Sequence, residues 1–97
     1  MVTLINNSKK FAVTGESTNF KLIGEASGIV ETKSIANFNG HFESLEGNYG
    51  GNFNFSETDA NKANKNIMDV DKDHFIELDT LLNDCIEELK EVLNDNE

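Results

Sequence analysis

Three aspartates at alternate positions, Asp69, Asp71 and Asp73, form the one stretch of this 97-residue chain that resembles a metal-binding loop. They match the first carboxylate ligands of an EF-hand loop. Two essential residues are absent, because His74 replaces the turn-forming Gly and Thr80 replaces the closing Glu. Helix capping and solvation explain the three aspartates more simply. We therefore expect no metal site, and a weak calcium-binding module is the third functional hypothesis.

Cys85, His41 and His74 are the residue types of a nucleophile and a base. Cys85 lies between Leu82 and Leu89 on an apolar stripe, where burial raises the pKa of a thiol and removes its reactivity. Nothing in the sequence pairs either His with it. The chain also lacks a Gly-rich phosphate loop and the Gly-x-Ser-x-Gly, His-Glu-x-x-His and Cys-x-x-Cys motifs. We predict a protein that is not an enzyme and uses no cofactor.

Acidic residues of the last helix are the remaining candidates for a site. Glu77, Asp84 and Glu91 recur every seven residues, which corresponds to ~10.5 Å along a helix, and three base steps of DNA cover ~10.2 Å. Carboxylates at this spacing could imitate phosphates, although an acidic helix face is more often simply solvated. The predicted partner-binding residues are Glu77, Asp84, Glu87, Glu88 and Glu91.

The negative charge is concentrated in the last part of the chain. The net charge is -10, and residues 1–55 hold four Lys against five acidic residues, whereas residues 56–97 hold four Lys against thirteen. Such a field repels nucleic acid and anionic membranes and attracts basic proteins. The chain has no Arg, the usual bidentate reader of phosphates. We therefore predict no direct contact with nucleic acid or membrane, and a partner that presents the basic surface of a nucleic-acid-binding protein.

The composition also suggests a source. Fourteen Asn and no Arg are typical of an AT-rich genome, and a small acidic chain without catalytic groups suits a phage or mobile-element inhibitor of anti-CRISPR or anti-restriction type. No signal peptide or membrane span is apparent and there is one Cys, so we expect a cytoplasmic protein. The alternative is an oligomeric structural or accessory module, a homodimer in which the last helix pairs with its own copy.

A long amphipathic helix is predicted over residues 71–93, because apolar residues recur there at steps of three and four. Asp71 or Asp73 is expected to cap it. The members of this apolar stripe are Phe75, Leu78, Leu81, Leu82, Cys85, Ile86, Leu89, Val92 and Leu93. Since the stripe is broader than a coiled-coil seam, we expect it to pack on a sheet.

Residues 1–55 are predicted to form that sheet, within a single domain of residues 1–97. Alternating apolar residues indicate strands near residues 2–5, 10–16, 20–25, 29–38, 41–45 and 49–55. Asn39-Gly40 predicts a tight hairpin turn. Residues 56–70 are interpreted as a linker or a short helix near residues 57–66. The predicted fold class is α+β, an antiparallel meander of about five strands with the C-terminal helix packed on one face.

Overall fold

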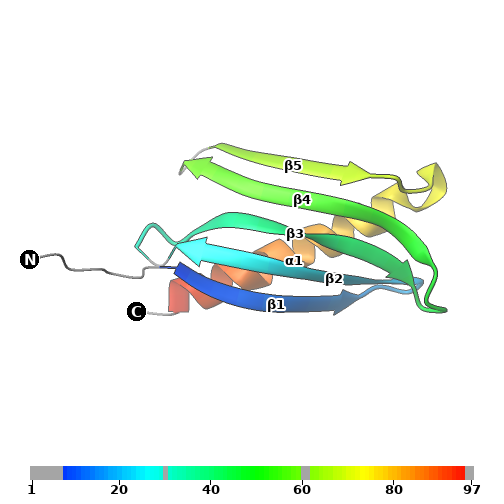
Figure 1. Cartoon of the computed structure of the whole chain (residues 1–97), viewed down its shortest axis with the longest axis horizontal. Coiled ribbons are helices and arrows are strands. Elements are labelled where there is room, and N and C mark those ends of the chain that lie inside the picture. Colours follow the sequence, from blue (N-terminus) through cyan, green and yellow to red (C-terminus); the bar gives the residue numbers. More distant parts are fainter. Residues whose placement is uncertain (1–7, 30, 60–61, 96–97) are drawn as a thin grey trace, which may run out of the picture.

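The computed structural model describes residues 8–29, 31–59 and 62–95, which form five strands followed by one long helix (Figure 1). A single 3-10 turn, η1 (Lys72–His74), leads into that helix, α1 (Phe75–Asp95). The strands are β1 (Ser8–Glu16), β2 (Phe20–Ile29), β3 (Ser34–Ser44), β4 (Tyr49–Asp59) and β5 (Lys62–Met68).

The strands pair in chain order, β1-β2-β3-β4-β5, and every neighbouring pair is antiparallel. The helix crosses one face of this meander diagonally and lies against β1, β2 and β3 (Figure 1). The predicted α+β fold is therefore confirmed. No described helix combines the length and the apolar character that crossing a membrane requires.

The core lies between α1 and the inner face of the sheet, the face that the helix covers. The registers place Ala26 opposite Phe38 and Phe38 opposite Phe55, so one face of three neighbouring strands is apolar. Phe53 packs against Phe38 at a centroid distance of 4.8 Å and against Phe42 at 5.2 Å. The largest fully buried side chains are Phe38, Phe42, Phe53, Leu22, Ile35, Leu78, Leu82 and Leu93.

The hairpin predicted at Asn39-Gly40 is wrong, because both residues lie in the middle of β3. The turn falls later, where Gly47 has φ 94° and its N–H donates to the Ser44 carbonyl at 2.8 Å. Gly40 has a different role. It lies opposite Gly24 on the inner face, and a Cβ there would collide with the Ile23 carbonyl of β2. The glycine permits close packing within the sheet rather than a turn.

The linker or short helix predicted over residues 56–70 is also wrong. Strand β4 continues to Asp59, and Lys62–Met68 forms the edge strand β5. Its side chains are exposed except for the partly buried Ile67, so β5 lacks the alternation by which a half-buried strand is recognised. Pairing with β4 holds it in place, with Asn66 Nδ2 donating to Asn54 Oδ1 at 3.0 Å. The strand predicted near residues 2–5 lies outside the described residues.

The helix predicted over residues 71–93 is present, with two differences in detail. Asp71 makes no side-chain capping hydrogen bond, and Asp73 lies inside η1. Phe75 and Val92 are each 45 % exposed, although both belong to the predicted stripe. The other members of the stripe are buried or partly buried against the sheet of the same chain. Little of the stripe is therefore left for pairing with a second copy.

Replacement of Gly40 by Ala tests the close packing. Gly40→Ala is expected to lower the free energy of unfolding by about 1–3 kcal/mol, because the added methyl presses on the backbone of β2. Urea denaturation followed by circular dichroism measures this change. Asn39→Ala, at the neighbouring exposed position, is the control and should change it by less than about 0.5 kcal/mol. Equal effects would contradict the packing role of Gly40.

Candidate functional site

Four of the five acidic residues predicted to bind a partner lie together on α1. Asp84, Glu87, Glu88 and Glu91 are exposed, and the 100° rotation per residue places them along one flank of the helix. We call these four residues the acidic stripe. Within the described part of the chain, none of them forms an ion pair or a side-chain hydrogen bond. The acidic stripe is thus an uncompensated row of carboxylates.

Glu77, the fifth predicted residue, has a structural contact instead. Its Oε2 accepts hydrogen bonds from the Ser17 hydroxyl and, at 2.9 Å, from the Asn19 backbone N–H, and its Oε1 accepts one from Asn19 Nδ2 at 3.1 Å. These hydrogen bonds, led by that of Ser17, lower the pKa of the Glu77 carboxyl. Glu77 therefore ties the first turn of α1 to the turn between β1 and β2.

The opposite flank of α1 is neutralised by contacts to the sheet. Lys90 Nζ lies 3.0 Å from the Glu57 carboxylate of β4 and donates to the Lys33 carbonyl at 3.0 Å. Lys65 of β5 lies 2.7 Å from the Asp79 carboxylate and also donates to Asn83 Oδ1 at 3.1 Å. The helix is consequently asymmetric, with compensated charges towards β4 and β5 and uncompensated acids on its other side.

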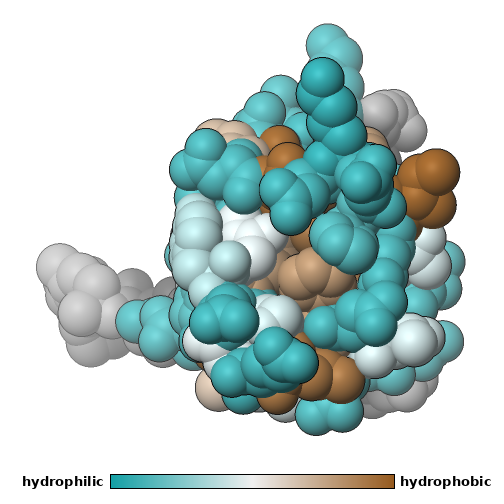
Figure 2. Space-filling model, turned by 90° about the vertical axis from the view of Figure 1, so that its right-hand side faces the viewer, coloured by the Kyte–Doolittle hydropathy of each residue, from teal (hydrophilic) through white to brown (hydrophobic). Residues whose placement is uncertain are grey.

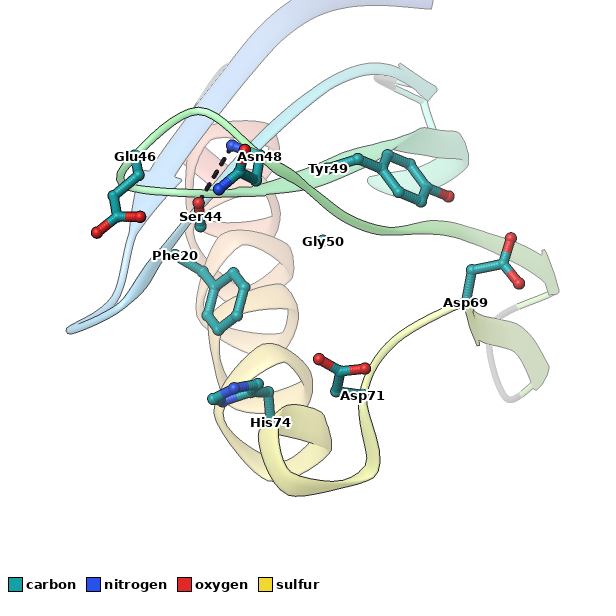
Figure 3. A pocket seen from close by; sticks show the side chains of 9 residues that line it. All are labelled: Phe20, Ser44, Glu46, Asn48, Tyr49, Gly50, Asp69, Asp71 and His74. Atoms are coloured by element: carbon teal, nitrogen blue, oxygen red, sulfur yellow. Dashed lines mark hydrogen bonds between the residues drawn. The ribbon is translucent and has the colours of Figure 1, made fainter.

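The aspartates of the metal-like loop do not converge. Asp69 and Asp71 line a pocket of about 260 Å³ at one end of the sheet, whereas Asp73 does not line it. Phe20 and His74 form the other wall, with ring centroids 4.9 Å apart, and Glu46 points away from Asp71 (Figure 3). Figure 2 shows this end of the molecule as a hydrophilic surface with apolar atoms in a central hollow. No three His, Cys, Asp or Glu side chains of the described residues are grouped to hold a metal ion.

The candidate nucleophile and bases are also far from forming a catalytic group. Cys85 is buried under the inner face of the sheet, and burial raises the pKa of its thiol to about 11. His41 is on the outer face, where its Nε2 lies 3.1 Å from Glu43 and this hydrogen bond is the main cause of the lowered Glu43 pKa. His74 packs on Phe20. The sheet therefore separates Cys85 from His41.

A groove beside β1 is a feature that the sequence did not reveal. It has a volume of about 220 Å³ and is lined by Phe11, Val13, Cys85, Glu88, Leu89 and Val92, among others. The alternation of Phe11 and Val13 in the sequence indicates a strand. Nothing in that pattern indicates that the strand lies at the edge of the sheet, next to the acidic stripe.

Comparison with known protein families, with curated proteins and with solved structures finds no match.

Glu77→Gln tests the structural contact through its pH dependence. A carboxyl whose pKa is lower in the folded than in the unfolded state stabilises above its unfolded pKa, and this contribution is lost as the pH falls through the folded pKa. Urea unfolding should therefore show a destabilised variant at about pH 7 and a much smaller difference at about pH 2. Glu87→Gln, at an exposed position of the same helix, is the control and should change the free energy of unfolding little at either pH. A pH-independent effect of Glu77→Gln would argue against the contact.

The burial of Cys85 predicts its reactivity. Because the thiolate is the reactive form, a pKa of about 11 leaves very little of it at neutral pH. We expect native protein to react with a disulfide reagent at least about a hundredfold more slowly than urea-unfolded protein, in which the thiol regains its ordinary pKa of about 8.5. The absorbance of the released thiol measures both rates. Comparable rates would show that Cys85 is accessible in the folded state.

Proposed function

We propose that this protein is a small non-enzymatic binding protein that occupies the basic surface of a nucleic-acid-binding protein through the acidic stripe. The observation that carries the proposal is the asymmetry of α1. On one flank Asp79 and Lys90 of α1 pair with Lys65 and Glu57 of the sheet, while the acidic stripe on the other flank is exposed and uncompensated. An uncompensated row of carboxylates favours a partner with lysines or arginines.

The charge of the whole chain supports the same partner. With a net charge of -10, long-range attraction raises the rate of encounter with a basic protein and opposes binding to nucleic acid itself. The seven residue steps from Asp84 to Glu91 span ~10.5 Å, which is close to three base steps of DNA at ~10.2 Å. Because Glu77 is held by the sheet, the phosphate-like spacing involves this one interval and not a longer row.

The proposed consequence of binding is competition with nucleic acid. A partner groove that holds the acidic stripe cannot at the same time hold phosphates, so the protein would inhibit its target. A phage or mobile-element inhibitor of anti-CRISPR or anti-restriction type is the finer form of this proposal. This form is supported by the small acidic chain, by an amino-acid composition typical of an AT-rich genome and by the absence of recognisable catalytic motifs.

Charge reversal on the acidic stripe tests the proposal. Wild-type protein is immobilised and exposed to a lysate of the cells that carry the gene or of their host, with and without excess double-stranded DNA. We expect a DNA-binding protein to be retained, to be released by salt and to be displaced by the DNA. The triple variant Asp84→Lys, Glu87→Lys, Glu91→Lys should weaken its binding by at least about tenfold, since each lost 1.4 kcal/mol corresponds to that factor.

A second triple variant controls for net charge. Glu16→Lys, Glu25→Lys, Glu46→Lys makes the same change in net charge at exposed positions away from α1. It should reduce the rate of association but retain the complex. Equal loss of binding in both variants would attribute the interaction to overall charge and contradict a site on α1. Retention that is indifferent to salt and to DNA would contradict the proposed competition.

A further inference from the structure

Strand β1 presents an edge that pairs with no other described strand, and some of its backbone groups are directed outward. It is the terminal strand of the sheet formed by the described residues. The Ser17 N–H donates to the Phe20 carbonyl at 2.8 Å, which makes Ser17 and Phe20 a hydrogen-bonded pair at the end of the β1–β2 ladder. Bonded and non-bonded pairs alternate from there. The N–H and C=O groups of Lys10, Ala12 and Thr14 therefore point away from β2.

The groove below this edge has an apolar floor. Phe11 and Val13 reach it from β1 and are partly buried, while Leu89 and Val92 reach it from α1. Val92 remains 45 % exposed because no described element covers it. A strand added to β1 would place every second side chain over this floor, since strand side chains alternate between the two faces of a sheet.

The charges around the groove indicate which kind of polypeptide segment it would bind. Glu88 lines it, and Asp84 and Glu91 lie one helical turn to either side of Glu88 on the acidic stripe. A second copy of the chain added to β1 would bring two acidic stripes towards each other, which is unfavourable. Long basic side chains fit instead, because their methylene groups cover apolar surface while the charged ends meet carboxylates.

The opposite edge of the sheet is less suited to an added strand. Strand β5 carries Lys62 and Lys65, and the side chain of Lys65 is engaged by Asp79. Edge lysines are a common means of preventing strand pairing. Strand β1 also carries two lysines, Lys9 and Lys10, but they lie near its start, and residues Phe11–Thr14 at its centre carry no charge.

We propose that the edge of β1 binds an extended segment of a basic partner as a sixth strand, with Lys or Arg at every second position facing the groove. The inference rests on the proposed function for the basic character of the partner and adds the mode of binding. Residues opposite Phe11 and Val13 would form non-hydrogen-bonded pairs, in which facing side chains approach closely. Their charged ends would then reach Glu88.

Two synthetic peptides of identical composition test strand addition. In the first octapeptide lysine and threonine alternate, and in the second four lysines precede four threonines. Both carry the same charge, but only the first places all its lysines on one face of a strand. Isothermal titration calorimetry should show the alternating peptide binding at least about tenfold more tightly. Equal affinities would reduce the interaction to non-specific electrostatics and overturn the proposal.

Amide hydrogen exchange of the whole chain locates the contact without a substitution. Binding of the alternating peptide should slow exchange at Ala12 and Thr14, whose N–H groups point outward, and leave Val13 unchanged, because its N–H is already bonded to β2. Unchanged exchange at Ala12 and Thr14 would overturn the proposal. So would slow exchange at both without peptide in a protein that light scattering finds dimeric, because a second copy would then occupy the edge.

Two substitutions of Ala12 distinguish the contribution of its backbone N–H to peptide binding from that of its side chain. Ala12→Pro removes an outward N–H while sparing the bonds to β2, and should abolish the preference for the alternating peptide. Ala12→Thr keeps that N–H and should retain the preference. Glu88→Lys should weaken the binding of the alternating peptide by about tenfold or more. If these expectations fail while the acidic-stripe variant still loses its captured protein, strand addition is wrong and the proposed function stands.

Discussion

The structure depends on one helix covering one face of a five-stranded sheet. Leu78 and Leu82 of α1 are fully buried with Phe38, Phe42 and Phe53 of the sheet. A single helix is about 10 Å wide, whereas five strands at ~4.8 Å spacing are about twice as wide. Because α1 lies against β1, β2 and β3, the two flanks of the helix face different surroundings (Figure 1). The asymmetry of charge on α1 follows from this placement.

The outer face of the sheet carries a row of asparagines. The registers place Asn39 opposite Asn54 and Asn54 opposite Asn66, so three strands carry a row of amides on the face that α1 does not cover. The asparagine content suggests a genomic origin, and the structure adds a physical role for these residues. Uncharged polar side chains keep this face hydrated without adding to a net charge of -10.

Polar contacts position the helix, and their distribution decides which charges remain available. Glu77 binds the Ser17–Asn19 turn at one end of α1, and Lys90 binds Glu57 nearer the other. Buried apolar contacts fix the distance between layers but resist sliding only weakly, whereas directed hydrogen bonds define position along the helix. The acidic stripe lies outside these contacts and beside the edge of β1 that no described strand pairs with. Negative charge, apolar surface and outward-directed backbone groups of the described residues thus lie on one side of the molecule.

Elements with a local sequence signal could be predicted without the structure. The 3.6-residue periodicity identified α1, alternation identified β1, β2 and β4, and the stripe of Cys85 correctly implied a buried thiol with a raised pKa. Other features became clear only from the three-dimensional arrangement: Asn39 and Gly40 lie within β3, Lys62–Met68 is a strand, Glu77 binds a distant turn, and β1 is a terminal strand among those described. Each of these depends on pairing between residues far apart in the chain. Local propensity cannot encode such a choice, because the free energy that settles it comes from the partner strand and from the packed core.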